Sequence, residues 1–127
     1  MEGLSRAKQK GIVKAAGVSC HNWEAMVRAA DEPWVDVLLA RVNPFGAHMD
    51  NNPETVAELL GKARAKGKGI IGMKIFGNGD RTGTPDREQS IRYALRKGNV
   101  HCMTLGLESP GQIDDAVERV MRIAGEA

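Results

Sequence analysis

A short apolar run followed by a polar turn and a helix-like segment recurs four times along this chain of 127 residues. The runs begin near residues 12, 35, 70 and 100, an interval of about 30 residues, which is the size of one βαβ unit. We predict strands over 12–18, 35–42, 70–76 and 100–105. Alternating strands and helices imply a parallel sheet with right-handed crossovers. The carboxyl ends of such strands, where α/β folds bind ligands, meet at one edge.

Capping residues set the expected helix boundaries, because their side chains bond the free amides of a first turn. We expect Ser19 or Asn22 to cap a helix over 23–31, Asn51 or Asn52 one that begins at Pro53, and Ser109 one that begins at Pro110. In the last helix Val117, Val120, Met121 and Ile123 are expected to form the buried face. Residues 4–10 have the pattern of a helix end preceding the first strand.

Composition limits the class of protein. A net charge of +2, with Lys and Arg scattered along the chain, does not favour nucleic-acid binding. No apolar run approaches the roughly 20 residues that span a bilayer, and the first six residues contain no apolar signal core, so a cytoplasmic protein is expected. Cys20 and Cys102 are expected to be free, buried thiols, and no residues have the spacing of a metal site.

Two architectures accommodate four βα units in a single domain over residues 1–127. One is a small doubly wound sheet. The other is half of a (β/α)8 TIM-type barrel, whose full form takes about 250 residues.

The strand ends resemble the fifth to eighth βα units of the aldo/keto reductase family, in order and at matching intervals. The matching segments are Gly17-Val18-Ser19, Asn43-Pro44, Gly69-Ile70-Ile71-Gly72-Met73-Lys74 and the run from Leu105 to Asp115. The resemblance implies the C-terminal, cofactor-binding half of a (β/α)8 barrel. It also implies reduction of a small carbonyl substrate by hydride from NADPH or NADH.

The resemblance also implies a cofactor-binding set. Its members are Ser19, Asn22, Lys74, Gly106, Leu107, Ser109 and Gln112. Ser19 matches the serine that bonds the nicotinamide carboxamide, although it could equally serve as a helix cap. Asn22 stands in for a family asparagine that Cys20 replaces. The last four members lie where the family holds the adenosine phosphate, at a helix N-terminus that offers free amides.

Departures from the family pattern matter as much as the matches. Leu39 stands in place of a glutamine and Lys74 in place of an aromatic residue that stacks on the nicotinamide. Leu107 and Gln112 occupy positions of basic residues that favour a 2′-phosphate, which leans toward NADH or a relaxed cofactor choice. The family's catalytic Asp, Tyr, Lys and His belong to its second to fourth strands and have no counterpart here. Tyr93 falls in mid-helix and is expected to be structural, so no catalytic residue is assigned.

Arg41 and His48 are further candidates, for substrate contact. Arg41 and Lys74 fall near strand ends, where each either contacts substrate or cofactor phosphate or pairs with Asp36 or Glu108. His48 lies in a polar loop that either contacts substrate or is simply solvated.

Three functions therefore remain open, the third being a doubly wound domain that binds an unrelated ligand. The first is the cofactor-binding half of an NAD(P)-dependent aldo/keto reductase, inactive as an isolated chain. The second is a non-catalytic half-barrel that assembles as a homodimer, because an open half-barrel exposes two strand edges and an apolar inner face.

Overall fold

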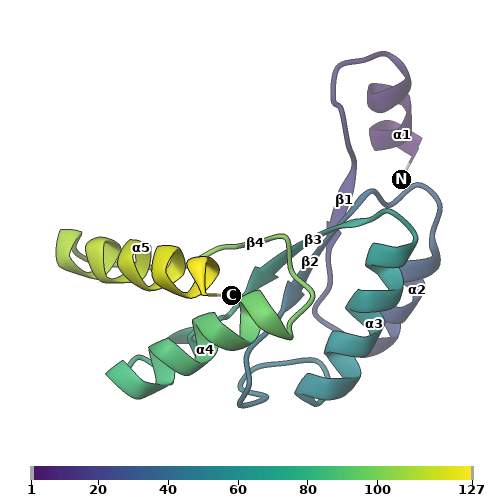
Figure 1. The fold of residues 1–127 in the computed structure, drawn as a ribbon. Coiled ribbons are helices and arrows are strands. Elements are labelled where there is room, and N and C mark those ends of the chain that lie inside the picture. Colours follow the sequence, from purple (N-terminus) through teal and green to yellow (C-terminus); the bar gives the residue numbers. More distant parts are fainter. Residues whose placement is uncertain (1, 127) are drawn as a thin grey trace.

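The computed structural model describes residues 2–126 and contains one sheet of four parallel strands that alternate with helices (Figure 1). The strands are β1 (Gly17–Ser19), β2 (Val37–Arg41), β3 (Gly69–Met73) and β4 (Cys102–Met103). The helices are α1 (Glu2–Gln9), α2 (Trp23–Asp31), α3 (Pro53–Ala65), α4 (Thr84–Arg96) and α5 (Pro110–Gly125), with a short 3-10 turn η1 (Gly77–Gly79). The predicted α/β class is confirmed.

The strand order separates the two architectures. Strands pair in the order β1-β2-β3-β4, the same as their order in the chain. A doubly wound sheet would instead reverse direction at a switch point and place helices on both faces. Consecutive parallel strands are consistent with half of a (β/α)8 barrel.

Side-chain burial shows that the helices cover only one face of the sheet. Leu38 and Ala40 of β2 and Ile70 of β3 are buried in a core that contains residues from α2, α3, α4 and α5. Their strand neighbours, among them Leu39 and Ile71, are only half-buried. Because successive residues of a strand point to opposite faces, these neighbours form an open face, which corresponds to the inside of a barrel.

Both outer strands are shorter than the sequence predicts. Residues 12–16 lie outside β1, and Ile12 is 73% exposed. β1 pairs only with β2, and this pairing begins at Gly17 opposite Val37. Just before it, the Ala16 carbonyl accepts the N–H of Asp36 at 2.8 Å. β4 has two residues paired with β3 rather than the expected six. β3 ends at Met73 because Lys74 adopts a positive φ of 56°.

Helix starts follow the capping residues. Asn22, Asn52 and Ser109 cap α2, α3 and α5 through side-chain oxygens that accept backbone N–H groups. The predicted limits of α2 are confirmed. Of the two proposed caps for this helix, Asn22 rather than Ser19 fills the position.

Two burial predictions are wrong. In α5, Ile123 is buried and Val120 packs on the core, but Val117 and Met121 are 56% and 70% exposed. The helix carries two apolar stripes, and the sheet ends at the two-residue β4 without covering the second. Cys20 is buried as expected, whereas Cys102 is exposed on the short edge strand.

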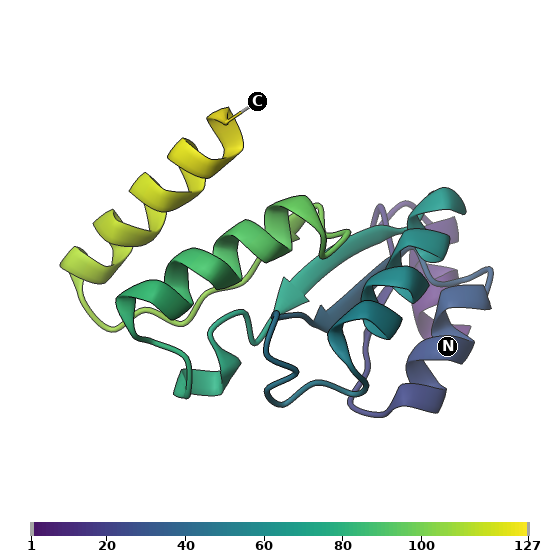
Figure 2. The same cartoon turned by 60° about the horizontal axis from the view of Figure 1, so that its bottom comes forward.

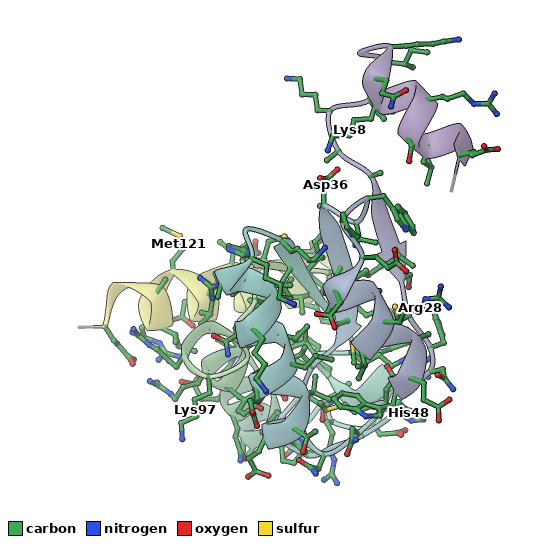
Figure 3. The ribbon with its side chains drawn as sticks, turned by 90° about the vertical axis from the view of Figure 1, so that its right-hand side faces the viewer. Lys8, Arg28, Asp36, His48, Lys97 and Met121 are labelled. Carbon is green, nitrogen blue, oxygen red and sulfur yellow. The ribbon has the colours of Figure 1, made fainter. Side chains whose placement is uncertain are left out.

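α1 stands apart from the other helices and is joined to the sheet by an extended segment (Figure 1). Its residues are exposed or half-buried. Lys8, near its end, points toward Asp36 at the start of β2, and the two side chains pair at 2.7 Å (Figure 3). In the described part of the chain, every helix is too short or too polar to cross a bilayer.

Candidate functional site

The carboxyl ends of the strands form two neighbouring polar regions on the open side of the sheet. Ser19 ends β1 and Arg41 ends β2, and Arg41 lies opposite Met73, the last residue of β3. Thr104 follows β4 and its N–H donates to Gly72 O at 2.8 Å. Parallel pairing therefore brings loops from four distant parts of the sequence to one edge.

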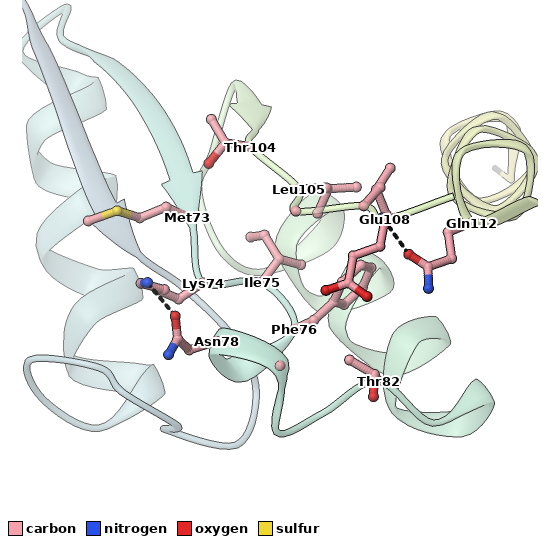
Figure 4. Close-up of a pocket in the computed structure, with 13 residues that line it drawn as sticks. Met73, Lys74, Ile75, Phe76, Asn78, Thr82, Thr104, Leu105, Glu108 and Gln112 are labelled. Atoms are coloured by element: carbon pink, nitrogen blue, oxygen red, sulfur yellow. Dashed lines mark hydrogen bonds between the residues drawn. The ribbon is translucent and has the colours of Figure 1, made fainter. Parts of the chain in front are cut away.

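A cleft of about 760 Å³ opens between the ends of β3 and β4 (Figure 4). Its walls include Met73 and Thr104. Four of the residues predicted to bind a cofactor also line it, namely Lys74, Gly106, Leu107 and Gln112. A second hollow of about 510 Å³ shares part of this lining and reaches Ser109 and Arg87. The two hollows share Phe76, Thr82, Gly106, Leu107 and Gln112, so they adjoin as one groove between the end of β3 and the start of α5.

The start of α5 forms one end of this groove. Ser109 Oγ accepts the N–H of Gln112 at 3.3 Å. Gln112 Oε1 accepts the N–H of Glu108 at 2.7 Å (Figure 4). These two bonds fix the loop, and the first of them occupies the Gln112 N–H of the first helical turn. Pro110 has no N–H, so the Gly111 N–H and the positive end of the helix dipole are what this turn offers an anion.

Lys74 supplies a cation at the other end of the groove. Its positive φ turns the chain out of β3, and its ammonium donates to Asn78 Oδ1. Asn43, fully buried, donates from Nδ2 to Lys74 O at 3.1 Å and to Ala47 O at 2.8 Å. A buried amide from the β2–α3 loop thus holds the backbone that carries the lysine. The partner of Lys74 is Asn78 rather than the predicted Asp36 or Glu108.

The second region lies at the ends of β1 and β2. Arg41 donates from Nη2 to His21 Nδ1, and His21 Nε2 lies 3.4 Å from Ser19 Oγ. Arg41 also lies 3.7 Å from Asp50, whose side chain is only 3% exposed. The acidic partner of Arg41 is therefore Asp50, and the predicted pairing with Asp36 or Glu108 is wrong.

The side chains of His48 and Asn22 are bonded to residues outside the cluster of Ser19, His21 and Arg41. The carbonyl of His48 accepts from Arg41 Nη1 at 3.2 Å, but its imidazole Nε2 pairs with Asp80 at 2.7 Å. Asn22 Oδ1 accepts the N–H of Ala25 at 3.0 Å, which commits that oxygen to the α2 cap. Tyr93 donates its hydroxyl to Pro53 O at 2.9 Å, away from the groove.

Several residues of these two regions were not predicted from the sequence. His21 and Asp50 were not expected to contact Arg41, and Arg87 and Glu108 were not expected to line a groove. The position of His21 two residues after Ser19 was a usable signal, because residues two apart on an extended chain share a face. Within residues 2–126, His, Cys, Asp and Glu side chains form no group suited to hold a metal ion.

Burial raises the pKa of the Cys20 thiol, and the nearby Asp50 charge adds to this effect. A thiol in this setting stays protonated, which argues against Cys20 as a nucleophile.

Comparison with known proteins gives one match. The model of the aldo/keto reductase family matches residues 1–124, nearly the whole chain. No curated protein and no solved structure matches it. A family match over this extent, together with parallel strands whose carboxyl ends carry the predicted residues, shows that the chain belongs to the aldo/keto reductase family.

Proposed function

We propose that this chain is the cofactor-binding portion of an aldo/keto reductase that reduces a small carbonyl compound. The family generally uses nicotinamide cofactors, which supply the hydride. The role of the protein is then to bind and orient the cofactor and to exclude water from the reaction. The observation that carries this proposal is the groove of two adjoining hollows along the ends of β3 and β4.

The volumes and shared lining of the two hollows support binding of a dinucleotide in the groove. Its two parts have volumes of about 760 and 510 Å³ and share Phe76, Gly106 and Leu107, among other residues. At one end, Ser109 and the first turn of α5 would hold a phosphate of the adenosine half. At the other, Lys74 would neutralise negative charge on the pyrophosphate. Ser19 would bond the carboxamide at the end of β1.

The charge of the groove bears on cofactor choice. Arg87 reaches the second hollow, but its Nε pairs with Asp115 at 3.1 Å, and Asp115 also binds Arg119. The charge of Arg87 is therefore only partly offset, because Asp115 is shared between the two arginines. Leu107 and Gln112 add no cation. With Leu107 and Gln112 uncharged and Arg87 partly offset, the groove supports NADH or a relaxed choice between the two cofactors.

We further propose that the family's Asp, Tyr, Lys and His are supplied by complementary βα units outside this sequence, in the same polypeptide or in a companion chain. Among residues 2–126, Tyr93 is the only tyrosine, and its hydroxyl is bonded to Pro53 O on the helical side. The uncovered face of the sheet supports this proposal, because complementary strands would bury it.

Cofactor titration tests the first part. Trp23 begins α2, just beyond Ser19, so NADH should quench protein fluorescence saturably, and Trp23→Phe should reduce the signal. Failure of both NADH and NADPH to bind would contradict the cofactor proposal. Carbonyl reduction by the purified chain alone would contradict the proposal that its acid–base residues lie elsewhere.

A second function is favoured by a different observation. Ile113, Val117 and Met121 form an exposed apolar stripe along α5, and Met121 points away from the body in Figure 3. Two copies could close eight strands into a barrel and cover such surfaces, giving a non-catalytic homodimeric module. Sedimentation equilibrium tests this directly: a chain that stays monomeric at high concentration contradicts it.

A further inference from the structure

The contacts of His21 carry an inference that rests on the proposed cofactor function and extends it. Ser19 lies opposite Leu39 in the sheet, and Arg41 is two residues beyond Leu39 on the same strand face. His21 extends from the end of β1 over this face and joins both, through Ser19 Oγ and Arg41 Nη2. A donor–acceptor pair therefore stands at the open side of the sheet.

Arg41 determines which imidazole nitrogen carries the proton. A guanidinium only donates hydrogen bonds, so His21 Nδ1 must be the acceptor of the bond from Nη2. A neutral ring whose Nδ1 accepts has its hydrogen on Nε2. The Nε2–H faces Ser19 Oγ at 3.4 Å, a long contact that leaves both groups able to engage a ligand.

Arg41 is itself held in place. Asp50 lies 3.7 Å from Nη1, and the His48 carbonyl accepts from the same nitrogen at 3.2 Å. Among the described residues, Asp50 Oδ2 is buried without a hydrogen-bond partner, so Arg41 provides the compensating charge for this carboxylate. Removing the charge would leave a buried carboxylate uncompensated, which opposes movement of Arg41 away from this position.

The neighbouring residues are committed elsewhere. Cys20 is buried in the core, and Asn22 Oδ1 caps α2 by accepting from Ala25. His21 is exposed. A primary amide needs a donor for its oxygen and an acceptor for its nitrogen, and this pair offers both.

We propose that His21 binds the nicotinamide carboxamide together with Ser19, and that Arg41 is the positioning residue for His21. The Nε2–H of His21 donates to the carboxamide oxygen. Ser19 Oγ accepts from the carboxamide NH2 group. Arg41, fixed by Asp50, sets the tautomer and orientation of the ring.

Binding of NADH and ADP-ribose to the full chain tests this proposal, because ADP-ribose lacks the nicotinamide. His21→Phe should weaken NADH binding about three- to tenfold, the effect of one neutral hydrogen bond, and leave ADP-ribose binding unchanged. His21→Gln places an amide N–H at a similar reach and should restore most of the affinity. The 3-acetylpyridine analogue of NADH, whose acetyl group lacks the NH2, should lose less affinity on Ser19→Ala than NADH does.

The tautomer gives a readout that does not depend on cofactor. Nitrogen-15 chemical shifts of the His21 ring should show the hydrogen on Nε2 in the wild-type chain, and Arg41→Met should shift the population toward Nδ1–H. A wild-type ring protonated on Nδ1 would overturn the proposal, as would His21→Phe weakening ADP-ribose as much as NADH. If ADP-ribose and NADH bind but His21→Phe changes neither, His21 is not a ligand while the cofactor proposal stands. Failure of both to bind the wild-type chain would overturn the two proposals together.

Discussion

The carboxylate of Glu88 on α4 lies 2.7 Å from the guanidinium Nη2 of Arg122 on α5, a partner 34 residues away in sequence. Arg92 and Arg119 reach the same carboxylate at 3.0 and 2.8 Å. These contacts join the outer surfaces of α4 and α5, which lie side by side in Figure 2. The three guanidinium groups, Arg122 most of all, lower the pKa of Glu88 from 4.5 to about 2.

The fold should therefore lose stability in acid through Glu88. Because the pKa of Glu88 is lower in the folded chain, its ionised form stabilises the fold above pH 4.5, and this contribution disappears as pH falls toward 2. Urea unfolding should show wild type more stable than Glu88→Gln at pH 7, with the difference shrinking near pH 2. Glu118→Gln, which removes a mostly exposed partner of Arg122, is the matched control and should have little effect. An equal gap at both pH values would contradict the assignment.

Asn43 should be costly to replace although it lies in a loop. Its side chain makes four hydrogen bonds: two donated, to Ala47 O and Lys74 O, and two accepted, from Phe45 N and Ala47 N. Asn43→Ala leaves these buried groups without partners, and we expect a loss of about 2–4 kcal/mol in the free energy of unfolding. Chemical denaturation measures it. The control Asn51→Ala, which removes a more exposed amide bonded to Asn52 N, should cost under about 1 kcal/mol. A fully stable Asn43→Ala would show that the loop is not held this way.

Tyr93 should behave as a structural residue. Its hydroxyl donates to Pro53 O at 2.9 Å and thereby joins α4 to the start of α3. Tyr93→Phe removes only that bond, so the free energy of unfolding should fall by about 0.5–1.5 kcal/mol. NADH affinity, measured by fluorescence titration, should not change. A large loss of carbonyl reduction in the assembled enzyme, with NADH affinity intact, would instead identify Tyr93 as a proton donor.

The central strands and the helix starts could be predicted because their signals are local. An apolar run of strand length predicted β2, and Asn22 followed by a helix-like segment predicted the start of α2. The lengths of β1 and β4 could not be predicted: β1 pairs over three residues and β4 over two, although their neighbours β2 and β3 each have five. The buried face of α5 was also ambiguous: apolar residues follow two stripes, and only the tertiary structure decides that Ile123 is covered and Val117 is not.

The site was predictable only in part for a related reason. Strand-end positions such as Ser19 and Gly106 follow from the order of the elements. The contact of Arg41 with His21 depends on the register between β1 and β2 and on side-chain rotamers. Neither the strand register nor the rotamers can be read from the sequence alone. The pairing of Arg41 with Asp50 could not be predicted from the sequence either. Asp36 cannot reach Arg41 because it lies at the opposite end of β2, where it pairs with Lys8.

The exposed stripe on α5 should control association. Val117 is 56% exposed between Ile113 and Met121, so a partner that closes the barrel, whether a second copy or a companion chain, would remove it from water. Val117→Glu places a charge in that contact and should shift any dimer toward monomer, with a weaker association constant in sedimentation equilibrium. Val27→Glu, at an exposed apolar position on α2, is the matched control and should leave association unchanged. Dimerisation that survives Val117→Glu would place the interface elsewhere, and the uncovered face of the sheet around Leu39 and Ile71 would then be the surface to test.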